Sequence, residues 1–382
     1  MGVASMKLAI EEFMEGARTP EAVQQFLDSH QLPIVRDGTI TFLWRGEADA
    51  VHLRHWIYGL ASSQDLQRID GTDLWHLSLP LPPGSRVEYK FEIVRDGQGR
   101  WIRDPFNPNL ARDPFGANSV AHGEDYSVPE WAHSTPESAP GSYKTISFPS
   151  EAFGRRVLKL YLPARFRTTR RYPLLIVHDG EDYLNYASLG HVLDNLMARR
   201  EIPDMIVALT NSPNRLVEYA NDERHARFIT EELVPFLEDE FPLRTQPQSR
   251  CLMGASFGGV AALSTACRYP GFYGRLLLQS GSFAFSDIGE GHRRSEVFDP
   301  VVKFMNQFRA QPSAISERVF VSCGMYESLI YENRSLIPLL KSTGMNVRYR
   351  EARDGHNWEN WRDRLREGLS WLFPGAFLMM YE

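Results

Sequence analysis

The sequence predicts an α/β fold, with a doubly wound sheet covered by helices and a smaller β-sandwich domain in front of it. Between residues 144 and 382, apolar strand patterns alternate with helical patterns, which is typical of a parallel sheet with helices on both faces. Between residues 34 and 128 the pattern changes to short alternating segments broken by Gly, Pro and Asp, which indicates a β-sandwich. A chain of 382 residues is long enough for both domains.

The N-terminal part is expected to contain two short helices followed by the sandwich. Thr19 can cap a helix that starts at Pro20. The hairpin turn Arg95–Arg100 should lead into a returning strand, and the other expected strands are 39–44, 50–57, 74–79 and 87–94. The aromatic residues expected in the sandwich core are Trp44, Trp56, Trp75, Tyr89 and Phe91.

The larger domain is expected after a linker rich in Pro, Ser and Gly. The predicted boundaries are helices over 1–30, the sandwich over 31–128, the linker over 129–143 and the α/β domain over 144–382. Its predicted strands are 144–148, 156–161, 172–177, 205–209, 275–279, 319–323 and 346–351. Its predicted helices are 189–199, 224–240, 331–341 and 358–373.

Composition argues against several classes of partner. The net charge is −6 and no long basic run occurs, so neither nucleic acid nor an anionic membrane is a favoured partner. Cys251, Cys267 and Cys323 are dispersed within apolar runs, which favours buried thiols over disulfides or a metal site. The first residues lack a basic stretch followed by an apolar core, and no window reaches eighteen uninterrupted apolar residues, so we expect a cytoplasmic protein.

The stretch Gly254-Ala-Ser256-Phe257-Gly258 fits the G-x-S-x-G nucleophile elbow, a sharp turn that lifts a serine hydroxyl above a sheet. The apolar run before it reads as a strand and the run after it as a helix. A side chain at position 254 or 258 would collide with backbone in such a turn, which explains both glycines. The N–H of Phe257 would then stabilise an oxyanion. The alternative is a Gly-rich turn without chemistry.

A serine hydroxyl is a poor nucleophile at neutral pH, so the elbow requires a histidine base and a carboxylate that orients it. His356 follows the last predicted strand and precedes the last helix, where an α/β-hydrolase has its base. Glu327 stands just beyond the preceding strand and is the expected acid. Glu332 and Asp354 are its rivals.

Two further histidines are weaker candidates for the base. His292 lies in a polar loop and is expected at the surface, and His178 is poorly placed because it follows an early strand. The loop after that strand is where a second oxyanion donor belongs, so the backbone N–H groups of Gly180 and Glu181 are candidates.

Two resemblances add to this prediction. Residues 74–119, with Leu81-Pro82-Pro83-Gly84 and Asp104-Pro105-Phe106-Asn107-Pro108, look like an early-set immunoglobulin-like domain related to glycogen-binding modules. The motifs around residues 214–219, 254–259, 279–283, 324–333 and 354–361 resemble the esterase-D-like group that includes enterochelin esterases.

The second resemblance implies particular roles for several residues. It implies that Ser256, Glu327 and His356 are the catalytic triad. It also implies that Arg215, Glu218 and Trp358 lie in the substrate site, and the alternative for Arg215 and Glu218 is an ordinary ion pair that braces the loop.

The predicted function is a serine esterase without cofactor that acts on a small-molecule ester, by resemblance a catecholate siderophore trilactone. Arg215, Arg224 and Arg227 suit an anionic catecholate, unless they pair with Glu218, Glu223 and Glu231. A carbohydrate esterase, which releases acetyl or feruloyl groups, is the first alternative, and a non-catalytic binding module on a hydrolase scaffold is the second. An acyltransferase would use the same acyl-enzyme. The sequence makes no prediction of the oligomeric state.

Overall fold

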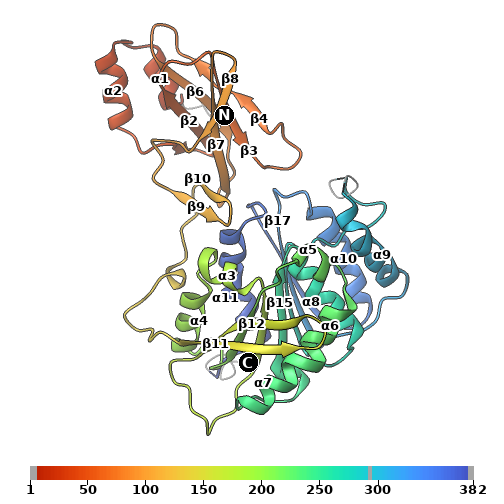
Figure 1. The fold of residues 1–382 in the computed structure, drawn as a ribbon. Helices are drawn as coiled ribbons and strands as arrows, with labels where there is room; N and C mark the ends of the chain where they lie inside the picture. Colours follow the sequence, from red (N-terminus) through yellow and green to blue (C-terminus); the bar gives the residue numbers. More distant parts are fainter. Residues whose placement is uncertain (1–6, 291–294, 377–382) are drawn as a thin grey trace, which may run out of the picture. The chain divides into compact units, whose positions relative to one another are not determined.

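The computed structural model describes residues 7–290 and 295–376, which form two compact units (Figure 1). The first unit holds the described residues up to Ser127 together with Arg353–Gly355. The second holds Val128–Ala352 and the described residues from His356 onward. His292 lies outside the described residues, so its expected exposure stays a prediction.

The first unit begins with the two predicted helices, α1 (Ala9–Met14) and α2 (Pro20–Asp28). The Thr19 hydroxyl accepts a hydrogen bond from the N–H of Ala22, and Pro20 occupies the first helical position, as predicted. Both helices bury apolar side chains, among them Ile10 and Leu27, in a cluster with sandwich residues. This packing stabilises two helices that are too short to persist alone.

Two antiparallel sheets form the sandwich. One has the strand order β1-β2-β6-β5, and the other has the order β4-β3-β7-β10-β9 with β8 also paired to β7. The turn between β7 and β8 is the two-residue loop Asp96-Gly97, in which both residues have positive φ, as a tight hairpin requires. The strands are β1 (Ile34–Arg36), β2 (Thr39–Arg45), β3 (Ala50–His55), β4 (Ser63–Asp65), β5 (Gln67–Arg68), β6 (Leu74–Pro80), β7 (Arg86–Arg95), β8 (Gln98–Ile102), β9 (Leu110–Asp113) and β10 (Gly116–His122).

Four of the five aromatic residues predicted for the sandwich core are buried there: Trp44, Trp75, Tyr89 and Phe91. The prediction for Trp56 is wrong, because this side chain is 52% exposed just beyond the end of β3. Alternation along the strand does not continue into the following turn, so the pattern could not fix its direction.

The second unit contains an eight-stranded sheet in the order β11-β12-β14-β13-β15-β16-β17-β18. β11, β12 and β14 are joined by antiparallel pairing, and all later neighbours are parallel. The strands are β11 (Ser142–Ser150), β12 (Gly154–Leu162), β13 (Leu174–His178), β14 (Ile206–Thr210), β15 (Arg250–Ala255), β16 (Arg275–Gln279), β17 (Arg318–Gly324) and β18 (Asn346–Ala352). The predicted doubly wound α/β sheet is therefore confirmed.

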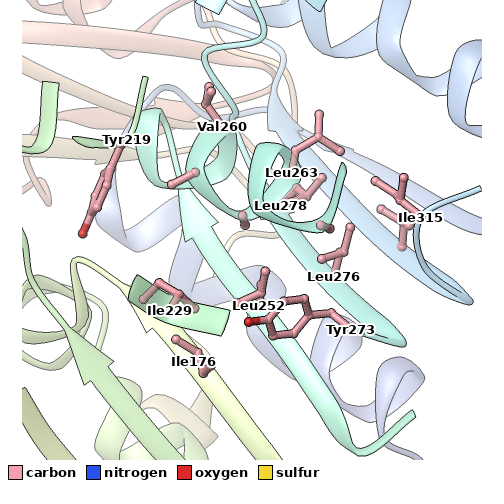
Figure 2. Close-up of a cluster of buried hydrophobic side chains, with 14 of the residues drawn as sticks. Ile176, Tyr219, Ile229, Leu252, Val260, Leu263, Tyr273, Leu276, Leu278 and Ile315 are labelled. Carbon is pink, nitrogen blue, oxygen red and sulfur yellow. The ribbon is translucent and has the colours of Figure 1, made fainter. Parts of the chain in front are cut away.

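Helices cover both faces of this sheet. Along β13, Ile176 belongs to the buried cluster that includes side chains of α8, α9 and α10, whereas Leu175 and Val177 belong to the cluster that includes side chains of α3, α4 and α11. Figure 2 shows the first of these clusters, in which side chains of β15, β16 and α8 meet. Because the central strands are buried on both faces, their sequences are continuous apolar runs.

The helices of the second unit include three that the sequence did not predict: α3 (Gly180–Tyr186), α5 (Arg215–Glu218) and α9 (Asp299–Ala310). The predicted helix 224–240 is α6 (Glu223–Arg227), a π-helical turn (Phe228–Leu233) and α7 (Val234–Glu240). The others are α4 (Leu189–Ala198), α8 (Phe257–Arg268), α10 (Ile330–Ser342) and α11 (Trp358–Leu372). In residues 7–290 and 295–376, no helix is long and apolar enough to span a membrane.

The segment expected as a linker is partly ordered against the second unit. Glu130–Ala132 forms a 3-10 turn, and the Trp131 side chain is buried among side chains of α4 and neighbouring elements. The Asn195 side chain of α4 donates to the carbonyl of Trp131. The three cysteines are free thiols; Cys251 and Cys323 are buried, as predicted, whereas Cys267 has intermediate exposure.

Candidate active site

Ser256 lies between β15 and α8 in a backbone conformation that side chains rarely adopt. Its φ is 56° and its ψ is −123°. A positive φ in a residue other than glycine costs roughly 1–3 kcal/mol and persists only where the surroundings impose it. Here every residue of β15 is buried and the first ten residues of α8 are buried, so packing on both sides holds the turn.

The two glycines of the elbow lie where there is little room for a side chain. A Cβ at Gly254 would lie 2.2 Å from the carbonyl oxygen of Gly258, which is too close for any side chain. A Cβ at Gly258 would lie 3.2 Å from the Cβ of His178. The predicted collision with backbone is confirmed for Gly254, whereas the nearest atoms to a Cβ at Gly258 belong to the side chains of His178 and Asp179.

His356 and Glu327 meet, as predicted. The Nδ1 of His356 lies 2.5 Å from Oε2 of Glu327, whose side chain is buried, whereas the imidazole is 36% exposed. Burial alone would raise the pKa of Glu327, but the adjacent His356 and hydrogen bonds from Ser280 and Gly324 hold this pKa below its usual value. An ionised Glu327 at neutral pH fixes the proton on Nδ1 and leaves Nε2 as the basic nitrogen.

The other oxygen of Glu327 is anchored by two donors. The Ser280 hydroxyl donates to Oε1 at 2.5 Å, and the N–H of Gly324 donates to the same atom at 2.7 Å. The indole N–H of Trp361 donates in turn to the Ser280 hydroxyl at 2.9 Å. The sequence did not identify Ser280 or Trp361 as site residues, although both lie in quoted motifs, because their roles depend on contacts between distant segments.

The two rival carboxylates have other surroundings. Glu332 is buried in the first turn of α10, and burial together with the charge of Glu327 raises its pKa to about 7. Asp354 accepts from the N–H of Gly355 at 2.7 Å and from Arg86 at 3.3 Å. Of the three carboxylates, Glu327 makes the hydrogen bond to His356.

The hydrogen bond that the structure gives to the Ser256 hydroxyl is with Ser282, at 3.2 Å. Between described side chains, no hydrogen bond joins Ser256 to His356. Such contacts are often loose in an enzyme without substrate and tighten when substrate binds. The Ser256 hydroxyl is partly exposed, and the pair of His356 and Glu327 is already assembled.

Two of the three candidate oxyanion donors remain available. Phe257 and Gly180 are the first residues of α8 and α3, and the hydrogen bonds of the described residues include none from their N–H groups. The N–H of Glu181 instead donates to the side-chain oxygen of Asn211 at 3.3 Å. This bond makes Glu181 the weakest of the three candidates.

Arg215 and Glu218 do not pair with each other, so the ion pair considered as an alternative is wrong. Arg215 binds Asp179 through two nitrogens, with a shortest distance of 2.8 Å. Glu218 is buried and accepts from Arg156 at 2.7 Å. Glu218 needs a partner deep in the fold, where an unpaired charge would be costly, and Arg156 of β12 supplies it.

The other expected binding residues lie at the surface or in an aromatic cluster. Arg224 is largely exposed and pairs with Asp222, not with the glutamates proposed from the sequence. Arg227 is also exposed. Trp358 is partly buried, and its ring packs edge-on against Tyr183 at a centroid distance of 5.2 Å.

The fold and the site together define an esterase of the α/β class. A family model described as "Putative esterase" matches residues 150–372, which is more than half of the chain, and one described as "Enterochelin esterase, N-terminal" matches residues 39–132. The chain belongs to the first of these families and carries the N-terminal domain of the second.

Known relatives agree with this assignment. An iron(III) enterobactin esterase of Escherichia coli is 24% identical in an alignment 381 positions long, which covers 88% of this chain and 92% of that protein. An acetyl esterase of Caldicellulosiruptor saccharolyticus is 23% identical and covers 50% of this chain and 82% of its own length. The crystal structure of an enterobactin esterase from Shigella flexneri superposes with a TM-score of 0.73 at 23% identity, over 91% of this chain and 97% of that one.

The raised pKa of Glu332 predicts that the stability difference between wild type and Glu332→Gln grows with pH. Its value is about 7 in the folded protein and 4.5 in an unfolded chain. The neutral carboxyl therefore contributes stability that is complete below pH 4.5 and is lost as the pH rises through 7. We expect Glu332→Gln to raise Tm relative to wild type by more at pH 8 than at pH 5, as measured by thermal denaturation.

The exposed Glu240 at the end of α7 provides the control, since Glu240→Gln should change Tm little at either pH. An equal effect of Glu332→Gln at both pH values would contradict the prediction.

Proposed function

We propose that this protein is a serine esterase in which Ser256 is the nucleophile, His356 the general base and Glu327 the acid that orients it. The observation that carries the proposal is the hydrogen bond between His356 and the buried Glu327, in a chain whose strand-to-helix elbow exposes a serine. A carboxylate, an imidazole and an elbow serine are the groups that acyl transfer needs.

In the first half of the reaction, the Ser256 oxygen attacks the ester carbonyl carbon, and its proton passes to Nε2 of His356. Glu327 accepts the hydrogen bond from Nδ1 and stabilises the imidazolium. The tetrahedral intermediate carries its negative charge on the former carbonyl oxygen, which the N–H groups of Phe257 and Gly180 would bind. When the bond to the leaving alcohol breaks, His356 returns the proton to that oxygen.

In the second half, water replaces the alcohol. His356 removes a proton from the water as it attacks the acyl-enzyme, and a second tetrahedral intermediate forms at the same oxyanion site. Its collapse breaks the bond to Ser256 and returns the proton to the serine oxygen. The products are a free acid and an alcohol, and the enzyme is restored.

For the substrate, we propose a catecholate siderophore trilactone. The match to an enterochelin esterase N-terminal domain and the similarity to enterobactin esterases support this choice. Arg215, Arg224 and Arg227 would complement an anionic catecholate by charge and by stacking. A sugar ester is the second candidate, since an acetyl esterase is also among the relatives.

Labelling of Ser256 tests the proposed nucleophile. We expect a fluorophosphonate to modify one serine per chain, Ser256, and we expect Ser256→Ala to lose both labelling and turnover of a nitrophenyl ester, because no other group can form the acyl-enzyme. Ser282→Ala is the matched control, since it removes the neighbouring hydroxyl and should remain labelled. Turnover close to wild type in Ser256→Ala would rule out the enzymatic mechanism.

Replacement of Glu327 tests the acid. Glu327→Gln keeps the shape but removes the charge that stabilises the imidazolium, so kcat should fall by roughly a hundredfold or more while the protein remains folded. Glu332→Gln serves as the control, and its kcat should stay within a few fold of wild type. A large loss in Glu332→Gln together with an active Glu327→Gln would transfer the role to Glu332.

Substrate preference is tested with three ester classes. We expect kcat/KM to be higher for an enterobactin-like trilactone than for feruloyl or acetyl sugar esters, and its advantage should shrink at moderate salt because Arg224 and Arg227 are exposed. Arg224→Gln should raise KM for the trilactone and leave a neutral nitrophenyl ester unaffected. A tenfold higher kcat/KM for a sugar ester would overturn the siderophore assignment and leave the esterase in place.

A further inference from the structure

We propose that His225 is a positioning residue for the esterase reaction: through His178 it fixes the loop whose Gly180 N–H would bind the oxyanion. The inference rests on the proposed function, since it assumes that this loop contributes to acyl transfer. Neither histidine takes part in the proposed proton transfers, and both are buried inside the second unit.

His178 links three parts of the fold. It is the last residue of β13 and is fully buried. Its Nδ1 lies 3.0 Å from the carbonyl oxygen of Met253, which belongs to the nucleophile strand β15, and its Nε2 lies 3.0 Å from Nε2 of His225 in α6. The imidazole therefore connects the strand before Ser256, the candidate oxyanion loop and α6.

The partners of these two rings dictate where the protons lie. A carbonyl oxygen only accepts hydrogen bonds, so Nδ1 of His178 must carry a proton. In a neutral His178 ring, Nε2 is then an acceptor, and the hydrogen bond between the rings must come from the Nε2–H of His225. The Nδ1 of a neutral His225 carries no proton. These proton positions agree with the structure, in which Nδ1 of His225 has no hydrogen-bond partner among the described residues.

The surroundings keep the pair neutral. Burial, the neighbouring His178 and the charge of Arg156 lower the pKa of His225 well below its usual value. Glu218 is the nearest carboxylate, with Oε2 at 3.9 Å from Nδ1 of His225, but its other oxygen is already bound to Arg156. Burial likewise lowers the pKa of His178. Near neutral pH the pair therefore has the single proton order described above.

The loop that follows His178 is held residue by residue. The N–H of Asp179 donates to the Tyr219 hydroxyl at 3.3 Å, and Tyr219 also packs edge-on against the His178 ring. Arg215 donates to the carboxylate of Asp179. The backbone of Asp179 is left-handed, with a φ of 54°. A Cβ at Gly180 would lie 2.5 Å from the Cα of Leu209 in β14, so the loop cannot move toward that strand.

The His178 side chain joins the end of β13, from which this loop starts, to the strand that carries the nucleophile turn, in addition to the backbone pairing of β13 with β15. If His225 no longer donated to Nε2 of His178, this buried nitrogen would be left without a donor and the His178 ring could reorient. The Gly180 N–H would then lose one of the contacts that fix its position relative to the carbonyl of Met253. A shift of this kind affects the transition state more than substrate binding, because the oxyanion forms only during the reaction.

Three substitutions of His225 separate its hydrogen bond from its volume. His225→Gln retains an N–H₂ group at the position of Nε2, His225→Asn places that group at the position of Nδ1, and His225→Phe keeps a ring without any donor. We expect kcat to fall by about tenfold in the Phe and Asn variants, with little change in KM, and to recover in the Gln variant. Inhibition by an aryl boronic acid, whose tetrahedral adduct with Ser256 occupies the oxyanion site, should weaken by the same factor.

Thr230→Val is the matched control. It breaks a buried hydrogen bond of 2.9 Å between Thr230 and Tyr273 in the turn that follows α6, so it should lower Tm while kcat and boronate affinity stay at the wild-type values. If the role of His225 were purely structural, His225→Phe would likewise lower Tm and leave kcat and boronate affinity at the wild-type values. That result would overturn the inference. Equal impairment of the Gln and Phe variants would also overturn it.

The proton order has a test that does not depend on activity. Nuclear magnetic resonance should detect two slowly exchanging imidazole N–H protons, one on Nδ1 of His178 and one on Nε2 of His225, and His225→Phe should remove one of them. If Ser256→Ala remained active, the proposed function would fail while this signature persisted. Absence of both protons in the wild type would refute the pair itself.

Discussion

The contact on which the site depends is the close backbone approach at the elbow, where Gly254 and Gly258 nearly touch. It forces Ser256 into a left-handed conformation that costs roughly 1–3 kcal/mol. Burial of β15 and most of α8 offsets this cost, since a buried apolar side chain contributes about 1.5–3 kcal/mol. The strain has a chemical consequence, because the same turn lifts the hydroxyl and frees the N–H of Phe257.

A buried carboxylate sets the second constraint. Glu327 is placed where water cannot solvate it, so its charge depends on His356, Ser280 and Gly324. Trp361 of α11 extends the network to the helix that follows His356. The orientation of the imidazole therefore depends on β17, the end of β16 and α11 together, and damage to any of these elements would reach His356.

The charged groups near β13 are also paired, because a buried charge without a partner is costly. On a helix surface, Arg215 and Glu218 could pair, since residues three apart are neighbours. Glu218 is instead turned into the protein and takes Arg156 from β12, while Arg215 holds Asp179. With these partners, Oε2 of the buried Glu218 lies 3.9 Å from Nδ1 of His225. The histidine pair thus belongs to a site whose partners come from β12, β13, α5 and α6.

The sequence alone determined the main strands of the parallel sheet, four of the helices that cover it and the elbow, because burial periodicity and the need for glycine are local properties. It also placed Glu327 just beyond a core strand, but the choice over Glu332 and Asp354 depended on which carboxylate reaches His356 across the sheet. The tertiary structure decided that choice, the partner of Arg215, the exposure of Trp56 and the contact between His178 and His225. These residues are distant in the chain, and side-chain pairing depends on which distant segments meet during packing, which local patterns do not encode.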